Sequence, residues 1–451
     1  MMTGLESVQT EFAAIVGGDR VAGDDAACNA LAVAGRVPRF AIYPRMAEQV
    51  AAALKCTADH NLAVIPSRNA TKLGIGNIPA RYDVALSLKE MNNVWHYEPE
   101  DLTATVEAGM KLGDLQRMLC RHRLWLPLDP QGGARASVGG ILAANASGPL
   151  RLLYGAPRDM IVGMTIATTE GKIIKAGGRV VKNVAGYDLT KLLIGSFGTL
   201  GVIVEAHLKL FPLPAGRATC VFELANLEAA RDLRKRIVNS PLTPMRMVLL
   251  NSEAQAMVAQ GAFQRRPDAQ WTLWVEAGGS EKVLQRYARE LEEFGRVAGA
   301  PIVWLENQDA ERGWERISNF HSCPEGDLSV SMILKGAFPI AHVEDFVLRA
   351  HQEADRLKSR RAVYAQVGSG VVHVCFLNPS ESSTTLTLIQ SLRTVAKELR
   401  GSLVIERCDA EIKRQIDVWD SPGIDFEIMG KVKQAWDPKG ILSPGRFVGR
   451  L

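Results

Sequence analysis

The chain has 451 residues, of which 47% are hydrophobic and 23% are charged, enough to form buried cores in two or three domains. Its formal net charge of +4 is small for this length, and basic and acidic residues are mixed along it, so we expect no nucleic-acid partner. We find no N-terminal signal pattern and no run of roughly 18 apolar residues, so we expect neither export nor a transmembrane segment.

Seven cysteines are scattered singly along the chain, without any CxxC pair. An odd number of isolated cysteines is typical of reduced thiols rather than of disulfides or iron–sulfur ligands. We therefore expect a cytoplasmic protein that builds no iron–sulfur cluster on cysteine pairs of its own.

The first half of the chain alternates between helical and strand-like patterns. Residues 44–60 begin with a proline, which is favoured at the first position of a helix, and their apolar residues recur at helical spacing. Residues 62–67 and 84–88 are short apolar runs that are typical of buried strands. Helical spacing returns in residues 112–122, so the first domain is predicted to mix α and β structure.

Two further stretches alternate strictly between apolar and polar residues. In residues 102–108, the even positions are apolar and share one face, whereas the odd positions are polar and share the other. This pattern predicts a half-buried strand. Residues 202–210 alternate in the same way and predict another strand.

A segment that contains proline and glycine, FPLPAG at residues 211–216, ends the glycine-rich half, and we place a domain boundary there. Beyond it, long charged helices are predicted at residues 280–299 and 339–359. Short strands alternate with these helices, at residues 271–277, 328–335, 363–368 and 371–376. The pattern predicts an α+β domain in which helices cover one face of a sheet.

Half of the residues in ASVGGILAANASGPLRLLYG, residues 136–155, are Gly, Ala or Ser. Gly139 and Gly140 could let backbone N–H groups approach a pyrophosphate, and the small residues after them could leave room for a flat aromatic group. Close packing of a helix against a strand explains such a stretch as well, and it is the commoner cause when the stretch is taken alone.

Together with its neighbours, this stretch resembles the FAD-binding domain of the vanillyl-alcohol oxidase (PCMH-type) family, and within that family the FAD-binding subunits of bacterial glycolate oxidases. Four segments carry the resemblance: residues 125–164, residues 177–214, the helix–strand–loop at residues 43–77, and the tail WDPKGILSPGR at residues 436–446. The first two are long, ordered and adjacent in the sequence. They are therefore far more specific than a lone glycine motif.

The resemblance implies an α+β fold with a two-subdomain PCMH-type FAD-binding domain, then an α+β, ferredoxin-like cap domain, then a C-terminal tail that returns to the FAD domain. We place the N-terminal extension at residues 1–36 and the FAD-binding domain at residues 37–214. The cap is placed at residues 215–430 and the tail at residues 431–451. Residues 182–192 are expected to form a turn and a helix that carry the chain back under the cofactor.

The resemblance also implies which residues bind FAD. The backbone of Gly139 and Gly140 would lie near the pyrophosphate, Ser147 and its neighbours would line the flavin, and Ile203 or its neighbour would meet the adenine edge. The full set of expected FAD-binding residues is Ser67, Arg68, Asn69, Ala70, Thr71, Pro127, Gly139, Gly140, Ala143, Asn145, Ser147, Gly148, Gly201 and Ile203.

The first loop, PSRNATKLGIG at residues 66–76, departs from the family pattern, which has a glycine run ending in Thr or Ser. Asn69 tolerates a left-handed backbone, whereas Arg68 adopts one less readily. Either Arg68 supplies charge to the phosphates in place of curvature, or the affinity for FAD is reduced. The loop contains no histidine or cysteine, so we expect the FAD to be non-covalent and dissociable.

The cap departs from the family pattern as well. Related 2-hydroxy acid dehydrogenases have a His-rich strand and a Glu-His pair that bind a metal, but here Gln366 and Arg407 replace two of the histidines. His373 and Glu406 remain, and two ligands make a poor divalent site, so we expect no metal. His373, Arg407 and Arg446 are weak candidates for catalytic residues, and Arg446 could supply a cation near the flavin or could be a solvated surface residue.

These departures lead us to expect the FAD-binding accessory subunit of a glycolate oxidase-type complex. The resemblance implies that a second FAD-containing subunit oxidises glycolate, a small 2-hydroxy acid, to glyoxylate, and that an iron–sulfur subunit accepts the electrons. The complex would be cytoplasmic or peripheral at the inner membrane. Two alternatives remain: a self-sufficient FAD-linked oxidase or dehydrogenase of another alcohol or sugar acid, and a non-enzymatic scaffold that has lost FAD.

Overall fold

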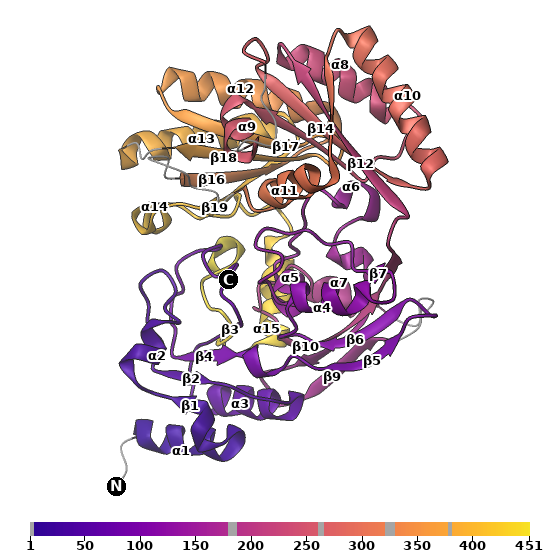
Figure 1. Cartoon of the computed structure of the whole chain (residues 1–451). Helices are drawn as coiled ribbons and strands as arrows, with labels where there is room; N and C mark the ends of the chain where they lie inside the picture. The colour runs from indigo at the N-terminus through magenta and orange to yellow at the C-terminus, as the bar shows by residue number, and fades with distance from the viewer. Residues whose placement is uncertain (1–3, 179–186, 260–265, 321–329, 378–380) are drawn as a thin grey trace.

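The computed structural model describes residues 4–178, 187–259, 266–320, 330–377 and 381–451 (Figure 1). The chain forms an N-terminal domain with two sheets and a C-terminal domain with one large sheet. The last helix and the tail, coloured yellow, run back from the C-terminal domain beside the N-terminal one (Figure 1). Part of the expected turn at residues 182–192 and the first two residues of the strand expected at 328–335 lie outside the described residues.

The smaller sheet of the N-terminal domain has the strand order β1-β2-β4-β3, with β2 and β3 parallel to β4 and β1 antiparallel to β2. The buried apolar residues of helix α3 share a hydrophobic core with those of this sheet, and α1 packs on α3. Because β3 and β4 run in the same direction, the loop that follows β3 leaves the sheet at its carboxyl edge. The elements are α1 (Gly4–Val16), β1 (Val21–Ala22), β2 (Phe40–Ile42), α3 (Ala47–Asp59), β3 (Val64–Ser67) and β4 (Val84–Ser87).

The second sheet of this domain is antiparallel, with the order β5-β6-β10-β8-β9. It shares one hydrophobic core with the smaller sheet. Its elements are β5 (Val94–Glu98), β6 (Thr103–Glu107), β8 (Ile161–Ala167), β9 (Ile173–Gly177) and β10 (Val202–Lys209), with α4 (Leu112–Cys120), α5 (Val138–Ala143) and α7 (Leu189–Leu193) between strands. The strands and helices expected from periodicity in this half are present, with ends that differ by a few residues.

The expectation that residues 102–108 form a half-buried strand is wrong, because β6 is also covered on its polar face. Thr105 and Glu107 are both buried. The Thr105 hydroxyl is 2.9 Å from Nδ1 of His207, and a Glu107 carboxylate oxygen accepts a 2.7 Å hydrogen bond from the Asn93 N–H. Burial raises the pKa of Glu107. The polar side chains of β6 thus have hydrogen-bond partners inside the protein. Alternation of residue types alone does not reveal such partners.

The C-terminal domain is built on an antiparallel sheet of eight strands in the order β15-β12-β14-β13-β17-β18-β16-β19. The strands are β12 (Gly216–Leu224), β13 (Arg246–Asn251), β14 (Trp271–Gly279), β15 (Ile302–Leu305), β16 (Val330–Ala337), β17 (Arg360–Gln366), β18 (Val371–Leu377) and β19 (Ser402–Arg407). Four helices bury their apolar faces on one side of it: α8 (Leu227–Val238), α10 (Glu281–Ala298), α12 (Val343–Arg356) and α13 (Ser382–Glu398).

Helices lie on the second face of this sheet as well, where only one covered face was expected. Helices α9 (Ser252–Ala259) and α11 (Asn307–Ser318) pack there against a separate core that includes Trp274 and Trp314. Helix α9 has a weak periodic signal, whereas α11 buries Ala310, Gly313, Trp314 and Ile317 at helical spacing, a pattern that our sequence analysis did not use. They cover part of this face, and residues of β16–β19 beyond them contribute to a cavity described below.

A buried ionic cluster joins the two domains beside that cavity. Arg246 of β13 lies 3.0 Å from a carboxylate oxygen of Glu276 and 3.6 Å from one of Asp129, which belongs to the N-terminal domain. The same Asp129 carboxylate accepts hydrogen bonds of 3.1 and 3.2 Å from the Leu150 N–H. Burial raises the pKa of Asp129 to about 6. The cluster fixes the C-terminal sheet against the end of the segment at residues 136–150.

The C-terminal tail completes the N-terminal domain. After α14 (Ala410–Gln415) and α15 (Phe426–Trp436), the chain adds an extended segment to the smaller sheet next to β3. The Val64 N–H donates to the Ile441 carbonyl at 2.8 Å, and the Ser443 N–H donates to the Val64 carbonyl at 2.9 Å. Ile441 and Leu442 are fully buried in the N-terminal core.

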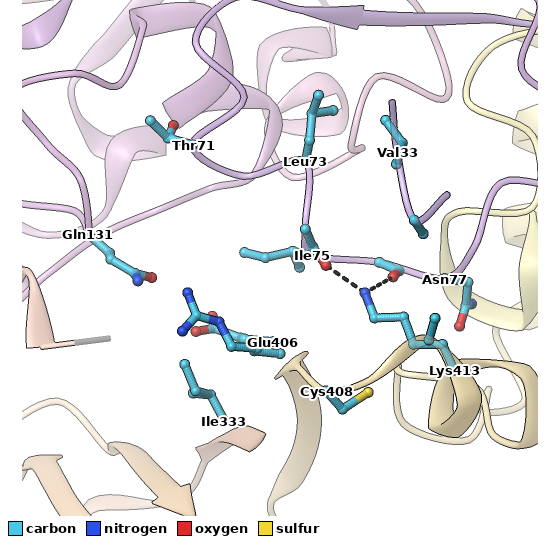
Figure 2. Close-up of a pocket in the computed structure, with 15 residues that line it drawn as sticks. Val33, Thr71, Leu73, Ile75, Asn77, Gln131, Ile333, Glu406, Cys408 and Lys413 are labelled. Atoms are coloured by element: carbon cyan, nitrogen blue, oxygen red, sulfur yellow. Dashed lines mark hydrogen bonds between the residues drawn. The ribbon is translucent and has the colours of Figure 1, made fainter. Parts of the chain in front are cut away.

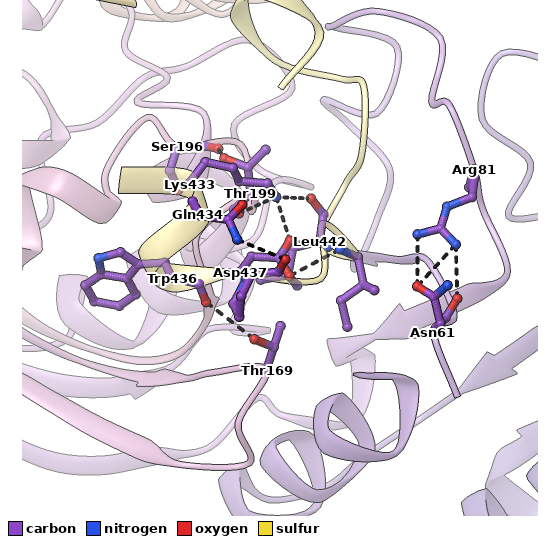
Figure 3. A network of polar contacts seen from close by, with 12 residues as sticks. Asn61, Arg81, Thr169, Ser196, Thr199, Lys433, Gln434, Trp436, Asp437 and Leu442 are labelled. Carbon is purple, nitrogen blue, oxygen red and sulfur yellow. Dashed lines mark hydrogen bonds and ion pairs between the residues drawn. The ribbon is translucent and has the colours of Figure 1, made fainter. Parts of the chain in front are cut away.

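Lys433 anchors this return (Figure 3). Its ammonium donates to the Thr199 carbonyl at 2.8 Å, to the Leu442 carbonyl at 2.9 Å and to the Asp437 carboxylate at 2.6 Å. Asp437 is itself buried and accepts hydrogen bonds from the N–H groups of Ile441 and Leu442. All three ammonium protons therefore have acceptors. Through them Lys433 connects α15, the tail and the segment just before β10.

We expect Lys433→Met to lower the free energy of unfolding by about 3–5 kcal/mol, because it leaves the buried Asp437 carboxylate without its counter-charge. The measurement is urea unfolding followed by tryptophan fluorescence. Lys431→Met is the matched control on the same helix, since Lys431 is exposed and forms a surface ion pair with Glu427. Equal midpoints for the two variants would show that the Lys433 network does not stabilise the tail.

Candidate active site

A cavity lies in the N-terminal domain between the loop after β3, the start of α5 and the segment that leads into β10. Three of its lining residues, Arg68, Lys72 and Arg446, are cationic, and none of the described lining residues is acidic. The tail contributes Arg446 and Ser443, so the cavity is closed by the C-terminal end of the chain. A cavity with only positive charges is suited to an anionic ligand.

The loop after β3 presents backbone donors to this cavity. The N–H groups of residues 69–72 donate no hydrogen bond to any described residue. The left-handed position of the loop falls on Ala70, with a φ of +56°, rather than on Asn69. Asn69 instead accepts a 2.5 Å hydrogen bond from Arg68 and donates one of 2.5 Å to the Arg135 carbonyl. Successive unpaired N–H groups of this kind form an anion-binding concavity.

Two buried cations hold the following part of the loop by its carbonyl groups. The Lys413 ammonium donates to the carbonyls of Gly74 at 2.6 Å and Gly76 at 3.0 Å, as Figure 2 shows. Arg446 donates to the carbonyls of Leu73, at 2.7 Å, and Ile75. Burial lowers the pKa of Arg446 to about 10, so the guanidinium stays charged at neutral pH.

The two glycines of the small-residue stretch have different environments. The Gly139 N–H donates to the Ala108 carbonyl at 2.8 Å, and a Cβ at Gly139 would lie 2.7 Å from the Ala108 Cβ. Gly139 therefore packs on the second sheet, and its N–H does not serve the cavity. At Gly140, a Cβ would meet only the Ser137 Oγ within 4 Å, so a side chain there would project into open space. Close packing thus explains Gly139, and space for a cofactor explains Gly140.

The structure brings most of the expected FAD-binding residues to the cavity, namely Ser67, Arg68, Asn69, Ala70, Thr71, Gly139, Gly140, Ala143, Gly201 and Ile203. Ser147 and Gly148 line a second cavity instead, where Gly148 is needed because a Cβ would lie 2.0 Å from the Asp129 carbonyl oxygen. Pro127 is buried after β7 (Leu124–Trp125), and Asn145 follows α5; neither lines either cavity.

Sequence analysis missed Lys72 and Phe197, which line both cavities together with Ala144. Phe197 has a left-handed backbone with a φ of +55°, and its N–H donates to the Ala143 carbonyl at 2.9 Å. Its ring contacts those of Trp419 and Phe447, with centroids 4.8 and 5.9 Å away. No signal in a single sequence marks such a position, and a lysine in a loop is usually solvated.

The second cavity lies between the two domains. The C-terminal sheet contributes Lys335, Tyr364, Gln366, His373 and Glu406 to its lining. Since the two cavities share lining residues, they adjoin. A ligand in the second cavity would therefore lie next to one end of a ligand in the first.

Glu406 is the centre of the polar contacts in this second cavity. One of its carboxylate oxygens lies 3.3 Å from the Lys335 ammonium, and the other lies 3.7 Å from Nε2 of His373. The buried His373 ring stacks on the Tyr364 ring at 5.0 Å, and the Tyr364 hydroxyl accepts a 2.8 Å hydrogen bond from Gln366. Gln366, His373 and Glu406, which are distant in the sequence, thus meet in one place.

Arg407 does not line the second cavity. It lines a neighbouring cavity with Cys408 and Lys413, and Glu406 lines both cavities. The hypothesis that Arg407 binds a substrate carboxylate stays a prediction. Arg446 does lie in the first cavity and is 4% exposed, which excludes the alternative of a solvated surface residue.

A divalent metal does not fit the second cavity. Among the described residues that line it, His373 and Glu406 are the two possible ligands, and the Lys335 ammonium already neutralises the carboxylate. In the part of the chain that the structure describes, the one group of three close His, Cys, Asp or Glu ligands is Glu11, Cys56 and His60, where α1 meets α3. Two protein ligands beside a resident cation do not make a stable metal site.

FAD does fit the first cavity. Ser67 Oγ, Arg68 Nε and Arg446 Nε are shielded from solvent and have no hydrogen-bond partner, and all three residues line the cavity. Unpaired buried donors are costly, so such a set indicates a ligand with several acceptor oxygens. A pyrophosphate has those oxygens and the negative charge that these cations require. The site and fold together are those of an FAD-dependent oxidoreductase.

Comparison with known families agrees with this class. Residues 38–177 match the family model described as FAD binding domain, and residues 213–447 match the model described as FAD linked oxidases, C-terminal domain. The second match covers more than half of the chain. The protein belongs to the FAD-linked oxidase family, with a PCMH-type FAD-binding fold.

Curated relatives match over nearly the whole chain. Glycolate oxidase subunit GlcD of Bacillus subtilis (strain 168) is 26% identical over 429 residues, which are 92% of this chain and 90% of that protein. The mitochondrial D-lactate dehydrogenase [cytochrome] of Arabidopsis thaliana is 26% identical over 432 residues, which are 93% and 75% of the two chains.

A solved structure shares the fold. The structure of p-cresol methylhydroxylase with substrate bound has a TM-score of 0.76 at 16% identity and covers 98% of this chain and 96% of that one. The helices of the described residues include none with the length and apolar character that crossing a membrane requires.

Gly140→Val should prevent FAD loading, whereas Arg68→Ala should weaken FAD binding by about tenfold. The valine side chain would fill space that the cofactor needs, while loss of Arg68 removes one charged donor that is also bonded to Asn69. The measurement is flavin absorbance per chain after loading and dialysis, with circular dichroism as the control for folding. Loss of flavin in Arg68→Ala but not in Gly140→Val would contradict this assignment of the pyrophosphate contacts.

Proposed function

We propose that this chain is the FAD-binding accessory subunit of a glycolate oxidase-type complex, which oxidises a 2-hydroxy acid such as glycolate to the 2-oxo acid glyoxylate. In this proposal FAD is bound non-covalently in the first cavity. The reacting 2-hydroxy acid is oxidised on a second FAD-containing subunit, and an iron–sulfur subunit accepts the electrons. The complex is cytoplasmic or peripheral at the inner membrane.

The residues of the first cavity support a role in electron transfer. FAD, when bound, supplies a ring that accepts and releases electrons. The chain's own part is to hold the pyrophosphate with the N–H groups of residues 69–72, with Arg68 and with Arg446, and to place Lys72 and Phe197 where the two cavities adjoin. A cation at that end of the cavity favours negative charge on a reduced flavin.

One observation supports the accessory role above the others: Lys335 neutralises Glu406 at 3.3 Å in the second cavity. Among the described lining residues, His373 supplies the imidazole, and it lies against the same carboxylate at 3.7 Å. Oxidation of a 2-hydroxy acid needs a base near the hydroxyl and a cation or metal for the carboxylate. The metal-binding histidines expected of self-sufficient relatives are Gln366 and Arg407 here, and Arg407 lies outside the cavity.

The relatives support the class of substrate and the idea of a complex. One curated relative is a subunit of glycolate oxidase and another is a D-lactate dehydrogenase, and glycolate and D-lactate are both 2-hydroxy acids. A chain that holds FAD but lacks a complete site for its own substrate needs a partner for both steps, the oxidation and the onward transfer of electrons.

Acid precipitation of the purified, FAD-loaded chain should release the yellow colour into the supernatant. The loop at residues 66–76 has no histidine or cysteine that could bond to the flavin. The measurement is flavin absorbance in supernatant and pellet. Colour retained in the pellet would contradict non-covalent binding, and a chain that cannot be loaded with FAD would support the scaffold that has lost its cofactor.

The isolated chain should oxidise glycolate or D-lactate at less than about 1% of the rate of the complete complex. The described residues of its site include no set of metal ligands, and the His373 imidazole already lies against the Glu406 carboxylate. The measurement is steady-state reduction of an artificial electron acceptor by the FAD-loaded chain and by the complex after co-purification.

His373→Ala and Arg407→Ala are the control variants for this comparison. Any residual rate of the isolated chain that does not depend on His373 is background. Robust turnover that His373→Ala abolishes would replace the accessory-subunit proposal with a self-sufficient dehydrogenase. Arg407→Ala should have no effect on turnover, because its side chain lies in the neighbouring cavity.

A further inference from the structure

Helix α1 packs on α3 (Figure 1), and three side chains with metal-binding atoms meet at this contact. Glu11 comes from α1, whereas Cys56 lies in the last turns of α3 and His60 is the C-cap residue of that helix. Residues four apart on a helix lie on the same face. The match to the FAD binding domain model starts at residue 38, so Glu11 belongs to an N-terminal extension outside that match.

The three ligand atoms are spaced like the corners of a tetrahedral metal site. Nε2 of His60 lies 3.1 and 3.0 Å from the two carboxylate oxygens of Glu11, and Sγ of Cys56 lies 3.6 Å from one of those oxygens. The ligand atoms of all three residues lie within 4.8 Å of one another. In tetrahedral zinc coordination, the bond lengths place a nitrogen about 3.4 Å and a sulfur about 3.6 Å from the oxygen. Small side-chain movements would therefore bring all three atoms onto one zinc ion.

The exposure of this cluster suits an ion that enters from solvent. Cys56 is 7% exposed, whereas the side chains of His60 and Glu11 are 34% and 47% exposed. The sulfur is therefore shielded, while the other two ligands reach the surface. A water molecule can supply the fourth ligand on that side, as it does in zinc sites with three protein ligands.

The chemistry of the ligands favours zinc over harder cations. A thiolate and an imidazole suit Zn²⁺, whereas Mg²⁺ and Ca²⁺ prefer oxygen ligands. Burial raises the pKa of Cys56 to about 12, and its thiol donates a hydrogen bond to Glu11. A bound zinc ion displaces the thiol proton to the buffer, because a coordinating thiol is deprotonated. The thiolate and the Glu11 carboxylate then neutralise the two charges of zinc, and neutral His60 binds through Nε2 with its proton on Nδ1.

We propose that Glu11, Cys56 and His60 form a zinc site that clamps α1 onto α3. The apolar side of α1 already packs on the domain through Val8 and Phe12, which are buried in the shared core. Zinc adds a link between the two helices where their contact meets solvent. The inference concerns the N-terminal extension and is independent of the proposed function of the flavin site.

Calorimetric titration of the reduced, FAD-loaded chain with Zn²⁺ measures this binding directly. We expect saturable binding of one ion per chain, and no binding of Mg²⁺ or Ca²⁺ at the same concentrations. Co²⁺ is the spectroscopic probe: the difference spectrum between the wild-type chain and Cys56→Ser, in which the flavin absorbance cancels, should contain a thiolate-to-cobalt charge-transfer band. Zinc should also slow hydrogen exchange of the backbone amides of residues 4–16.

Variants assign the ion to these ligands. Cys56→Ser, His60→Ala and Glu11→Gln should each raise the Kd for Zn²⁺ at least about tenfold, since even residues that only support a metal ligand contribute that much. His60→Ala and Glu11→Gln change partly exposed residues, so they keep the test decisive if Cys56→Ser does not fold. The matched controls are Cys120→Ser, which removes an exposed thiol at the end of α4, and Glu48→Gln, which removes an exposed carboxylate at the start of α3. Neither control should change the Kd.

The zinc site is contradicted if the wild-type chain shows no saturable binding of Zn²⁺, or if the folded ligand variants bind the ion with an unchanged Kd. Binding of Ca²⁺ as tight as that of Zn²⁺, or a cobalt complex without the charge-transfer band, would contradict Cys56 as a ligand. Zinc binding that leaves hydrogen exchange in α1 unchanged would overturn the clamp. None of these measurements involves turnover of a 2-hydroxy acid.

Discussion

The loop at residues 67–77 depends on two buried cations, and the flavin site depends on that loop. Arg446 and Lys413 together bind the carbonyl oxygens of residues 73–76. Those carbonyls are satisfied, whereas the N–H groups of residues 69–72 have no described acceptor. A run of glycines would let a loop curl around a phosphate by its own flexibility. Here Lys413 and Arg446, from the C-terminal third of the chain, hold the curved loop by hydrogen bonds to its carbonyl groups.

The sequence predicted those features of the site that depend on one residue type and its immediate neighbours. Gly140 faces open space, as the close approach of a cofactor requires. Residues of the loop and of the α5 turn meet in one cavity, as the family resemblance implied. The left-handed position at Ala70 was not predictable, because the strain is compensated by contacts that are remote in the sequence.

In the cap, the sequence did not predict which side chains meet in the cavity between the domains. Glu406 and Arg407 both line one cavity at the end of β19, and Glu406 alone also lines the cavity between the domains. The register of β19 against β16 shifts at this point, which strand alternation does not predict. Lys335 and Lys72 carried no motif, yet they determine the charge of the cavity between the domains. What a lysine does there depends on which carboxylate it meets, and only the packing of β16 beside β19 and of the N-terminal loop against the sheet decides that.

Ser443 and Arg446 follow the cap in the sequence, and this order has a consequence for biosynthesis. Both residues line the cavity whose other described walls precede the cap, and the Lys433 network holds the tail that carries them. The flavin site is therefore an open half-shell while the cap is being made. A chain that stops before Arg446 would keep both hydrophobic cores but lose the cation that shapes its phosphate-binding loop.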